Sequence, residues 1–321
     1  MSKIRITVFI LILILTLLTS LFFAPKVINP FHLDTTERNI LFSIRFPRIM
    51  VAFLMGMALG ASGAVLQGVL RNPLADPYIL GISSGASLSA AVSILSGFYI
   101  FGKFTIPLVA FFGASFVSIL VGFFGWRRGG LWPERLLLAG VGLSFLFHAI
   151  LMLLMSISPG ERLGRTIFWI FGDLSVADWA LIPCGSLFII SGFVIFLSRA
   201  KALNALILGD ELAHSLGFSV NRERLILFMS ISLMTAASVS LGGIIGFVGL
   251  LVPHMMRFFV GADSRILVPA SAIGGGTLLC IADLIGKSVM PPVEIPSGII
   301  TAIIGSPYFL YLLRRKDVLG T

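Results

Sequence analysis

Two short serine-containing stretches have residue types and spacings that could do chemistry. The sequence GASG at 60–63 fits the G-x-S-G pattern of rhomboid-like intramembrane serine proteases, in which Ser62 would be the nucleophile. The sequence GISSG at 81–85 fits the G-x-S-x-G pattern of serine hydrolases. A serine nucleophile needs a neighbouring base, which His148 or His254 could supply. An intramembrane protease is therefore one candidate function.

Neither serine pattern is specific, because small residues recur throughout the apolar parts of this chain and no third group to orient a histidine is apparent. LIGKS at 284–288 resembles the end of a P-loop, but the first glycine of that motif would fall on Ile281. There is no H-E-x-x-H motif and no His/Cys cluster, and Cys184 and Cys280 lie in apolar runs. We expect this chain itself to bind no metal, ATP or other cofactor.

The composition places these motifs in a membrane protein. The 321 residues are 57% hydrophobic and 12% charged, about half the charge of a soluble domain, and the mean hydropathy is +1.06. Long unbroken apolar runs predict an all-α polytopic protein and not a β-barrel. At about 20 residues per crossing, we predict ten spans in a single domain over 1–321. They lie at 6–24, 48–70, 80–99, 106–125, 136–157, 179–198, 225–243, 246–260, 266–286 and 297–313.

The distribution of Lys and Arg predicts the orientation. Ten spans place both termini on one side, and that side carries 14 of the 23 basic residues, against 8 on the other side and Arg71 between them. The positive-inside rule then makes both termini cytoplasmic, in a multi-pass protein of the inner (cytoplasmic) membrane. The net charge of +9 reflects this bias and contact with anionic lipid, and does not indicate nucleic-acid binding.

Small residues four apart form stripes on several spans, as in the second, at 56, 60, 64 and 68. Such stripes predict close packing of helices. The stripes of the fifth and tenth spans include polar groups that would be costly against lipid, so these two are predicted to line a water-filled path. The candidate path residues are Gly140, Ser144, His148, Gly298 and Ala302.

Polar residues gather in RNPLADP at 71–77, after the second span. Asn72 and Asp76 each precede a proline, which disfavours helix at both positions. Non-helical backbone at membrane depth is tolerated only inside protein or beside water. We predict a rigid elbow that is buried or faces a pore, with an ordinary cytoplasmic loop as the alternative.

The longest predicted cytoplasmic segment is 199–224, and its middle, Leu208 to Gly217, predicts a short helix bracketed by glycines. Asp210 and Glu211 lie at its N-terminus, where acids suit the helix dipole, and Leu212 and Leu216 would share a face. This helix is either a docking element for a partner or an interfacial helix on lipid.

Four stretches of the chain, in order, resemble the FecCD, or BtuC-type, permeases. They are 44–87 (IRFPRIMV to GISSGAS), 208–219 (LGDELAHSLGFS), 246–265 (GFVGLLVPHMMRFFVGADSR) and 294–313 (EIPSGIITAIIGSPYFLYLL). The resemblance runs nearly end to end. It implies a type II ATP-binding cassette (ABC) importer fold with ten helices in one permease domain, which agrees with the span count.

The resemblance also implies roles for residues. Asn72 and Leu74 of the elbow would form a cytoplasmic gate with Pro133 and Glu134. The helix at 208–219 would couple to the ATPase, through Leu208, Gly209, Asp210, Glu211, Leu212, Leu216 and Gly217. Arg45 and Arg48 match outward-facing arginines, expected as exposed cations that hold a substrate-binding protein. The third arginine of the family falls at Lys287, which keeps the charge but not the bidentate fork, and which Asp283 one turn earlier could instead pair.

The function implied is a membrane permease subunit of an ABC importer, not an enzyme. The partners implied are a second copy of the chain, two ATPase subunits that bind ATP and Mg²⁺, a substrate-binding protein and membrane lipid. The ligand would be an iron–siderophore, with haem, vitamin B12 or an oxyanion as alternatives. An ion-coupled carrier is the remaining alternative class, and Asp283 is its candidate acid well inside a span.

Overall fold

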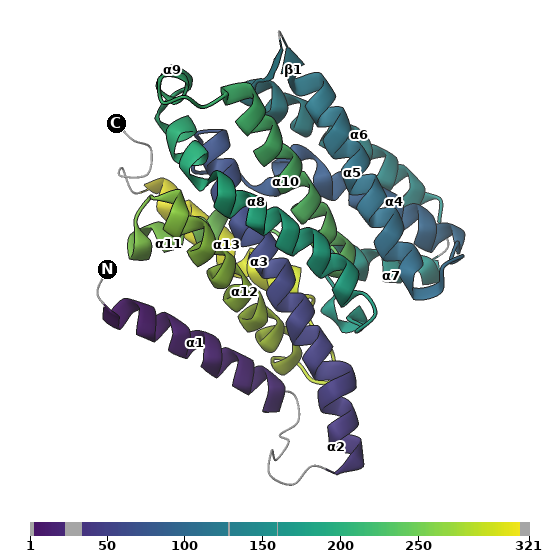
Figure 1. Ribbon diagram of the computed structural model, residues 1–321. Coiled ribbons are helices and arrows are strands. Elements are labelled where there is room, and N and C mark those ends of the chain that lie inside the picture. Colours follow the sequence, from purple (N-terminus) through teal and green to yellow (C-terminus); the bar gives the residue numbers. More distant parts are fainter. Residues whose placement is uncertain (1–2, 23–33, 128, 159, 315–321) are drawn as a thin grey trace.

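The computed structural model describes residues 3–22, 34–127, 129–158 and 160–314 (Figure 1). Within these residues, six helical segments are long and apolar enough to cross a membrane and four shorter apolar helices accompany them. Each of the ten predicted spans corresponds to one of these ten, so the predicted all-α polytopic fold is confirmed. Residues 23 and 24, at the end of the first predicted span, lie outside the described part of the chain.

The helices are α1 (Lys3–Phe22), α2 (Thr35–Asn39), the π-helix η1 (Ile40–Arg45), α3 (Phe46–Val69), the 3₁₀ helix η2 (Pro77–Leu80), α4 (Ile82–Ser96), η3 (Gly102–Phe104), α5 (Thr105–Gly125), α6 (Pro133–Ser156), α7 (Gly160–Ile170), η4 (Leu174–Val176), α8 (Ile182–Leu208), α9 (Asp210–Ser215), α10 (Val220–Gly242), α11 (Val248–Val260), α12 (Ser264–Ser288) and α13 (Ser297–Arg314). A two-stranded hairpin, β1 (Trp126–Arg127) with β2 (Gly130–Leu131), joins α5 to α6.

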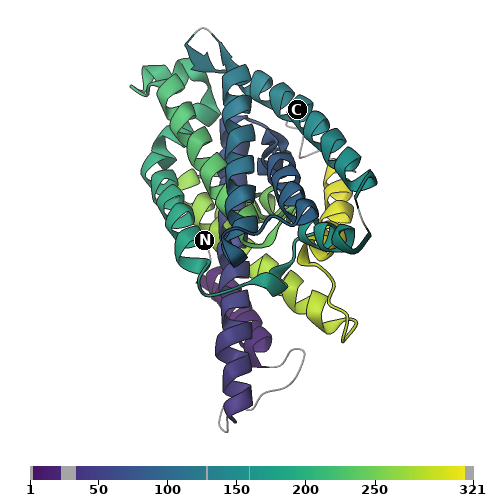
Figure 2. The same cartoon turned by 90° about the vertical axis from the view of Figure 1, so that its right-hand side faces the viewer.

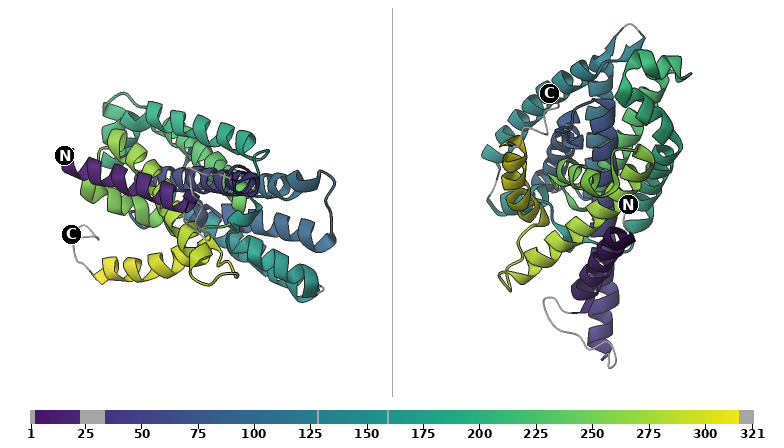
Figure 3. Two further views of the ribbon diagram at one scale, coloured as in Figure 1. Left: turned by 90° about the horizontal axis from the view of Figure 1, so that it is seen from below. Right: turned by 90° about the vertical axis from the view of Figure 1, so that its left-hand side faces the viewer.

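Helix α3 passes through the middle of the bundle in every view (Figures 1–3). Together with α2 and η1 it forms one helical segment of 35 residues, Thr35–Val69, which is about 52 Å long at 1.5 Å per residue. A hydrocarbon core is about 30 Å thick. The start of this segment therefore projects beyond the other helices, as α2 does in Figure 1.

Small residues of α3 pack against three other helices, and those of the predicted stripe contact two of them. Gly56 and Gly60 lie against the backbone of α12 at Gly275 and Ser271, and Gly68 lies against side chains of α8. Gly63, which is not part of the predicted stripe, lies against Gly249 at the start of α11. Close backbone approach of this kind is the packing role expected of small residues in a membrane.

We expect Gly56→Ala to destabilise the contact between α3 and α12. A methyl group at Gly56 would overlap the carbonyl of Gly275 and the Cα of Gly276, which are backbone atoms that move only with their helix. Overpacking of this kind costs about 1–3 kcal/mol, so the purified protein should unfold at a lower temperature. Gly142→Ala is the matched control, because nothing lies within 4 Å of a methyl group built there. Equal unfolding temperatures for the two variants would contradict this packing.

Several helix boundaries differ from the predicted spans, most of all at the second span, whose helical segment begins at Thr35 and not at residue 48. Helix α8 continues past residue 198 to Leu208, because residues 200, 202, 203, 205 and 206 are buried and keep the helix inside the bundle. Between α10 and α11 the chain is irregular over 243–247. Gly243 has a φ of +79° and lies against the carbonyl of Trp169, so any side chain there would be strained and would also collide.

The bundle has two ends, which we name by their short helices. At the α9 end, the hairpin, the end of α8 and the start of α10 meet, and Arg224 of α10 donates to the Leu131 carbonyl oxygen of the hairpin at 2.9 Å. At the α7 end, Arg162 of α7 donates to the carbonyl oxygen of Leu95 at the end of α4, at 2.7 Å.

Candidate functional site

The elbow between α3 and α4 is not helical until η2. Arg71 has a φ of +49°, and Asn72 Oδ1 accepts from the Leu74 amide at 2.9 Å. Asp76 Oδ1 accepts from the Tyr78 amide at 2.9 Å and caps η2. The predicted departure from helix at the two X-Pro steps is therefore confirmed, and Asn72 and Leu74 are half-buried.

Gln67 holds the elbow from inside the bundle. This buried residue of α3 donates from Nε2 to the carbonyl oxygens of Ala75 at 3.3 Å, Gly249 at 3.2 Å and Leu250 at 3.3 Å. These bonds tie the elbow to the first turn of α11. The sequence motifs did not indicate a role for Gln67, although a lone amide in an apolar span is a signal for a buried polar contact.

The short helix at the α9 end is present, and it is bracketed by Gly209 (φ +128°) and Gly217 (φ +86°). Leu208 ends α8 and α9 begins at Asp210. Leu212 and Leu216 are 46% and 58% exposed, while Ala213 between them is fully buried. The helix therefore presents an apolar edge outward and is fixed by its opposite face; Glu211 is exposed beside that edge.

The second predicted gate segment begins α6. Pro133 occupies the first turn of the helix and is half-buried, and Glu134 is exposed. The hairpin precedes both residues, with Trp132 Nε1 donating to the Arg127 carbonyl oxygen at 3.0 Å. Within the described residues, no hydrogen bond or ion pair joins this segment to Asn72 or Leu74, so one chain does not bring the two gate segments into polar contact.

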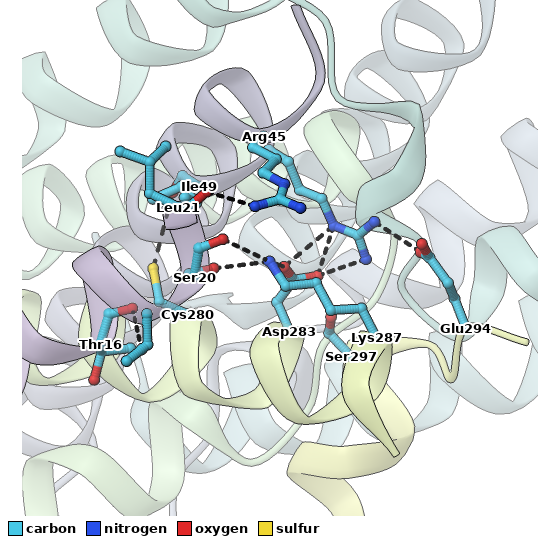
Figure 4. Close-up of polar contacts among 12 residues, drawn as sticks. Thr16, Ser20, Leu21, Arg45, Ile49, Cys280, Asp283, Lys287, Glu294 and Ser297 are labelled. Carbon is cyan, nitrogen blue, oxygen red and sulfur yellow. Dashed lines mark hydrogen bonds and ion pairs between the residues drawn. The ribbon is translucent and has the colours of Figure 1, made fainter. Parts of the chain in front are cut away.

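An ion-pair cluster occupies the α7 end (Figure 4). Arg48 lies over the carboxylate of Asp283, with Nη2 at 2.8 Å and Nε at 2.9 Å from Oδ1. The remaining terminal nitrogen, Nη1, lies 2.7 Å from Glu294 Oε2. Asp283 is 1% exposed and Glu294 is 44% exposed. Arg48 therefore bridges a buried acid of α12 and an acid at the surface.

The other two cations predicted for docking belong to the same cluster. Lys287 Nζ donates to Ser20 Oγ at 2.8 Å and lies 3.6 Å from Asp283 Oδ2, while Arg45 donates to the Leu21 carbonyl oxygen at 2.7 Å. Both contacts reach α1 (Figure 4).

The expected exposure of the three cations is wrong in this structure. The side chains of Arg48 and Lys287 are 11% and 3% exposed, and Arg45 is 5% exposed. Charges in an apolar bundle are stable only where an opposite charge and hydrogen bonds satisfy them. The alternative that Asp283 pairs with Lys287 is confirmed, with Arg48 as the closer partner. Among the described residues, Arg48 and Lys287 share the carboxylate of Asp283, and Glu294 is the second acid of the cluster.

The predicted path residues of α6 are placed differently from one another. Gly140 is buried against the carbonyl of Ile79 in η2, so it serves helix packing. Ser144 is half-buried, and its carbonyl oxygen lies 2.8 Å from Nδ1 of the exposed His148. In a single chain, therefore, Ser144 and His148 of the predicted stripe are at least partly accessible, whereas Gly140 is covered.

The predicted path residues of α13 border a shallow, open hollow. Gly298 and Ala302 border a hollow of about 570 Å³, together with residues of α7 and of the irregular segment before α11. Its wall is mostly apolar, and its other lining residues are Ile170, Phe171, Ile244, Gly246, Ile299, Ile303, Ser306 and Pro307. A smooth, weakly polar wall of this kind suits passage of a bulky solute.

The GASG motif at 60–63 does not form a protease site. Ser62 is fully buried, and neither its Oγ nor His254 Nε2 has a hydrogen-bond partner in the described part of the chain. His148 is exposed on α6 and bonded to the Ser144 carbonyl. Without a base beside the hydroxyl there is no activated nucleophile, and Ser62 instead fills the packed centre of α3.

The family model of the FecCD transport family matches residues 6–315. The chain belongs to the FecCD transport family. Among curated FecCD relatives, the hemin transport system permease protein HmuU of Yersinia pestis is 39% identical over 87% of this chain and 84% of its own length. The cobalamin import system permease protein BtuC of Halobacterium salinarum is 39% identical over 90% and 77%.

A solved structure agrees with the FecCD assignment. It shows an inward-facing conformation of a metal-chelate type ABC transporter, is 32% identical, and superposes with a TM-score of 0.87 over 98% of this chain and 99% of the other. This chain is accordingly a membrane-spanning permease subunit of an ABC importer. The carboxylate that an ion-coupled carrier would need, Asp283, is engaged by Arg48 and Lys287.

Proposed function

We propose that this FecCD permease imports a metal chelate, with an iron–siderophore as the first choice and haem or cobalamin as alternatives. The main observation in favour of the proposal is the shallow apolar hollow beside Gly298 and Ala302, which opens on the α13 face. Support for the ligand class comes from the hemin and cobalamin relatives and the metal-chelate transporter. ATP hydrolysis belongs to separate partner subunits in this proposal.

The transporter is proposed to contain two copies of this chain. Helices α6 and α13 lie on one outer face of the bundle (Figure 2, and the right view of Figure 3). Exposed apolar residues recur seven apart on both helices, which is the spacing of a helix contact surface. They are Leu138, Phe145 and Met152 on α6, and Ile303 and Leu310 on α13. A second copy on this face would enclose the hollow along the dimer axis.

The α9 end is proposed to face the cytoplasm, as the excess of Lys and Arg in its loops predicts. The count of 23 basic residues includes four that lie outside the described part of the chain, namely Lys26, Arg128, Arg315 and Lys316. In this orientation Leu212 and Leu216 offer an apolar edge to the ATPase, and Asn72, Leu74, Pro133 and Glu134 lie at the inner end of the path as gates.

The α7 end would then face the binding protein. Arg48 lines a hollow at this end together with Asp173 and Glu294, and a guanidinium at such a surface favours a partner with acidic residues. Glu294 covers the outer side of Arg48 and borders the same hollow of about 350 Å³ with residues of α7 and η4. An acidic group of the partner would reach Arg48 through this hollow.

We expect Glu294→Gln to speed association with the binding protein by a few-fold at low salt, because the acid that covers Arg48 is removed while Asp283 still holds it. Surface plasmon resonance with the transporter in nanodiscs measures this rate. Glu161→Gln removes the same charge from the exposed side of α7 and should have less effect. An unchanged or slower association for Glu294→Gln at low salt would count against Arg48 as a docking residue.

The proposed function is tested by reconstitution. The chain is purified with its partner ATPase, placed in liposomes together with the partner binding protein, and supplied with ferric hydroxamate, haem or cobalamin. ATP-dependent uptake of one of the three is expected, with strict dependence on the ATPase. Uptake driven by a proton or sodium gradient without ATP would overturn the proposal.

A further inference from the structure

A polar network joins five segments at the α9 end. Arg71, the first residue of the elbow, donates from Nε to the Leu206 carbonyl oxygen of α8 at 2.8 Å and pairs through Nη2 with Asp210 of α9. Asp210 also accepts from Arg224 Nη2 of α10, at 2.9 and 3.1 Å. Arg224 Nη1 reaches the Leu131 carbonyl oxygen of the hairpin at 2.9 Å. One carboxylate thus holds two arginines, one from the elbow and one from α10.

The two arginines of this network differ in how firmly they are held. The Arg224 side chain is 5% exposed and lies between α9 and the hairpin, whereas the Arg71 side chain is 41% exposed. A buried, paired guanidinium resists displacement because moving it leaves charge without a partner. When α9 shifts, Arg71 is therefore the partner that follows it.

Arg71 is also rigidly connected to the rest of the elbow, from Asn72 to Leu74. Its left-handed backbone is rare for a residue other than glycine. The next residue, Asn72, donates from its amide to the Gln67 carbonyl oxygen at 3.0 Å, and its side chain bonds the Leu74 amide. A displacement at Arg71 is thus carried to Leu74 by a short, internally bonded segment, which is the physical requirement for coupling.

We infer that Arg71 is a positioning residue that transmits movement of α9 to the elbow, with Asp210 as its partner. The inference rests on the proposed function, in which the ATPase moves α9 and the elbow gates the path. No span pattern or motif assigns Arg71 this role.

The experiment measures the elbow directly, without a transported ligand. Leu74→Cys is introduced in a Cys184→Ala background, because Cys184 is exposed and the remaining Cys280 is buried. Maleimide labelling of the complex with its ATPase is timed without nucleotide and after trapping with ATP and vanadate. The two labelling rates should differ by about 5- to 150-fold, the usual range for coupling between sites.

Arg71→Gln should bring the two labelling rates to within about twofold of each other, while ATP hydrolysis continues. In this variant Asp210 still forms its ion pair with Arg224, so the fold and the apolar edge of α9 are preserved. Arg71→Lys should be intermediate, because an ammonium keeps the charge but lacks the fork that reaches both Leu206 and Asp210. Arg265→Gln is the control, since it breaks an exposed ion pair with Asp263 at the same end.

Each result that differs from these expectations has a distinct interpretation. An Arg71→Gln complex that keeps the parent ratio of labelling rates overturns the inference. Failure of that variant to assemble with the ATPase would assign Arg71 to folding and also overturn it. A parent complex without nucleotide-dependent labelling would refute the gate role of the elbow in the proposed function, and the inference with it.

Discussion

An Asp283→Ala variant is expected to lose about 3–5 kcal/mol of unfolding free energy, the usual cost of breaking a buried ion pair from one side. Asp283 is 1% exposed and is the shared partner of Arg48 and Lys287. Without it, two cations remain inside an apolar bundle, and only Arg48 keeps another acid, Glu294. Because charge is still costlier at membrane depth, much less protein should be recovered.

Thermal unfolding of the detergent-purified protein, followed by size-exclusion chromatography, measures this loss. Lys103→Gln is the control, because it breaks an ion pair with Asp178 in which both side chains are exposed and which is worth less than about 1 kcal/mol. Asp283→Asn should fall between the two, since its amide oxygen still accepts hydrogen bonds. An Asp283→Ala protein that unfolds at the parent temperature would show that the cluster contributes nothing to stability.

Replacing Leu212 and Leu216 with aspartate is expected to abolish ATP-driven uptake and to weaken ATPase binding by about 10–100-fold, as loss of two apolar anchors at an interface does. Both leucines are exposed on one edge of α9, so the substitutions place charge in no packed core. The buried Ala213 and the ion pairs of Asp210 still hold the helix. The fold should therefore survive while coupling is lost.

Co-purification of the ATPase and its rate of ATP hydrolysis in nanodiscs measure the effect. Val176→Asp is the control, because Val176 is a similarly exposed aliphatic residue at the α7 end. It should leave ATPase binding unchanged. If the double variant retains both the ATPase and uptake, α9 lies on lipid, which is the alternative that its apolar edge also allows.

The direct test of docking by reversing Arg45 and Arg48 to glutamate is weakened by the ion-pair cluster. Arg45 is buried, the Arg48 side chain is only 11% exposed, and both are bonded, so reversal would place acids near Asp283 and disturb folding as well as docking. Removing Glu294 at the surface separates the two effects, because the buried pair of Arg48 with Asp283 remains.

The sequence by itself determined the elements. Unbroken apolar runs of about 20 residues predict helices that cross a bilayer. In the described part of the chain a helix lies at each of the ten runs, and six of these helices are long and apolar enough to cross a membrane. The X-Pro steps at Asn72 and Asp76 predict the elbow, and Gly209 and Gly217 predict the ends of α9. These features depend on residues within a turn or two of one another, which is the range that a sequence pattern covers.

Only the tertiary structure decided the partners. Arg48 pairs with Asp283, 235 positions away, and Arg71 with Asp210, 139 positions away. The sequence indicated only the pair one turn apart, Asp283 with Lys287. Which distant charges meet depends on which helices the small residues allow to approach, and many pairings of apolar helices are compatible with one hydropathy pattern. Once the helices are packed, a buried charge must use the opposite charge within its reach, because in a medium without water an unpaired ion is too costly to keep.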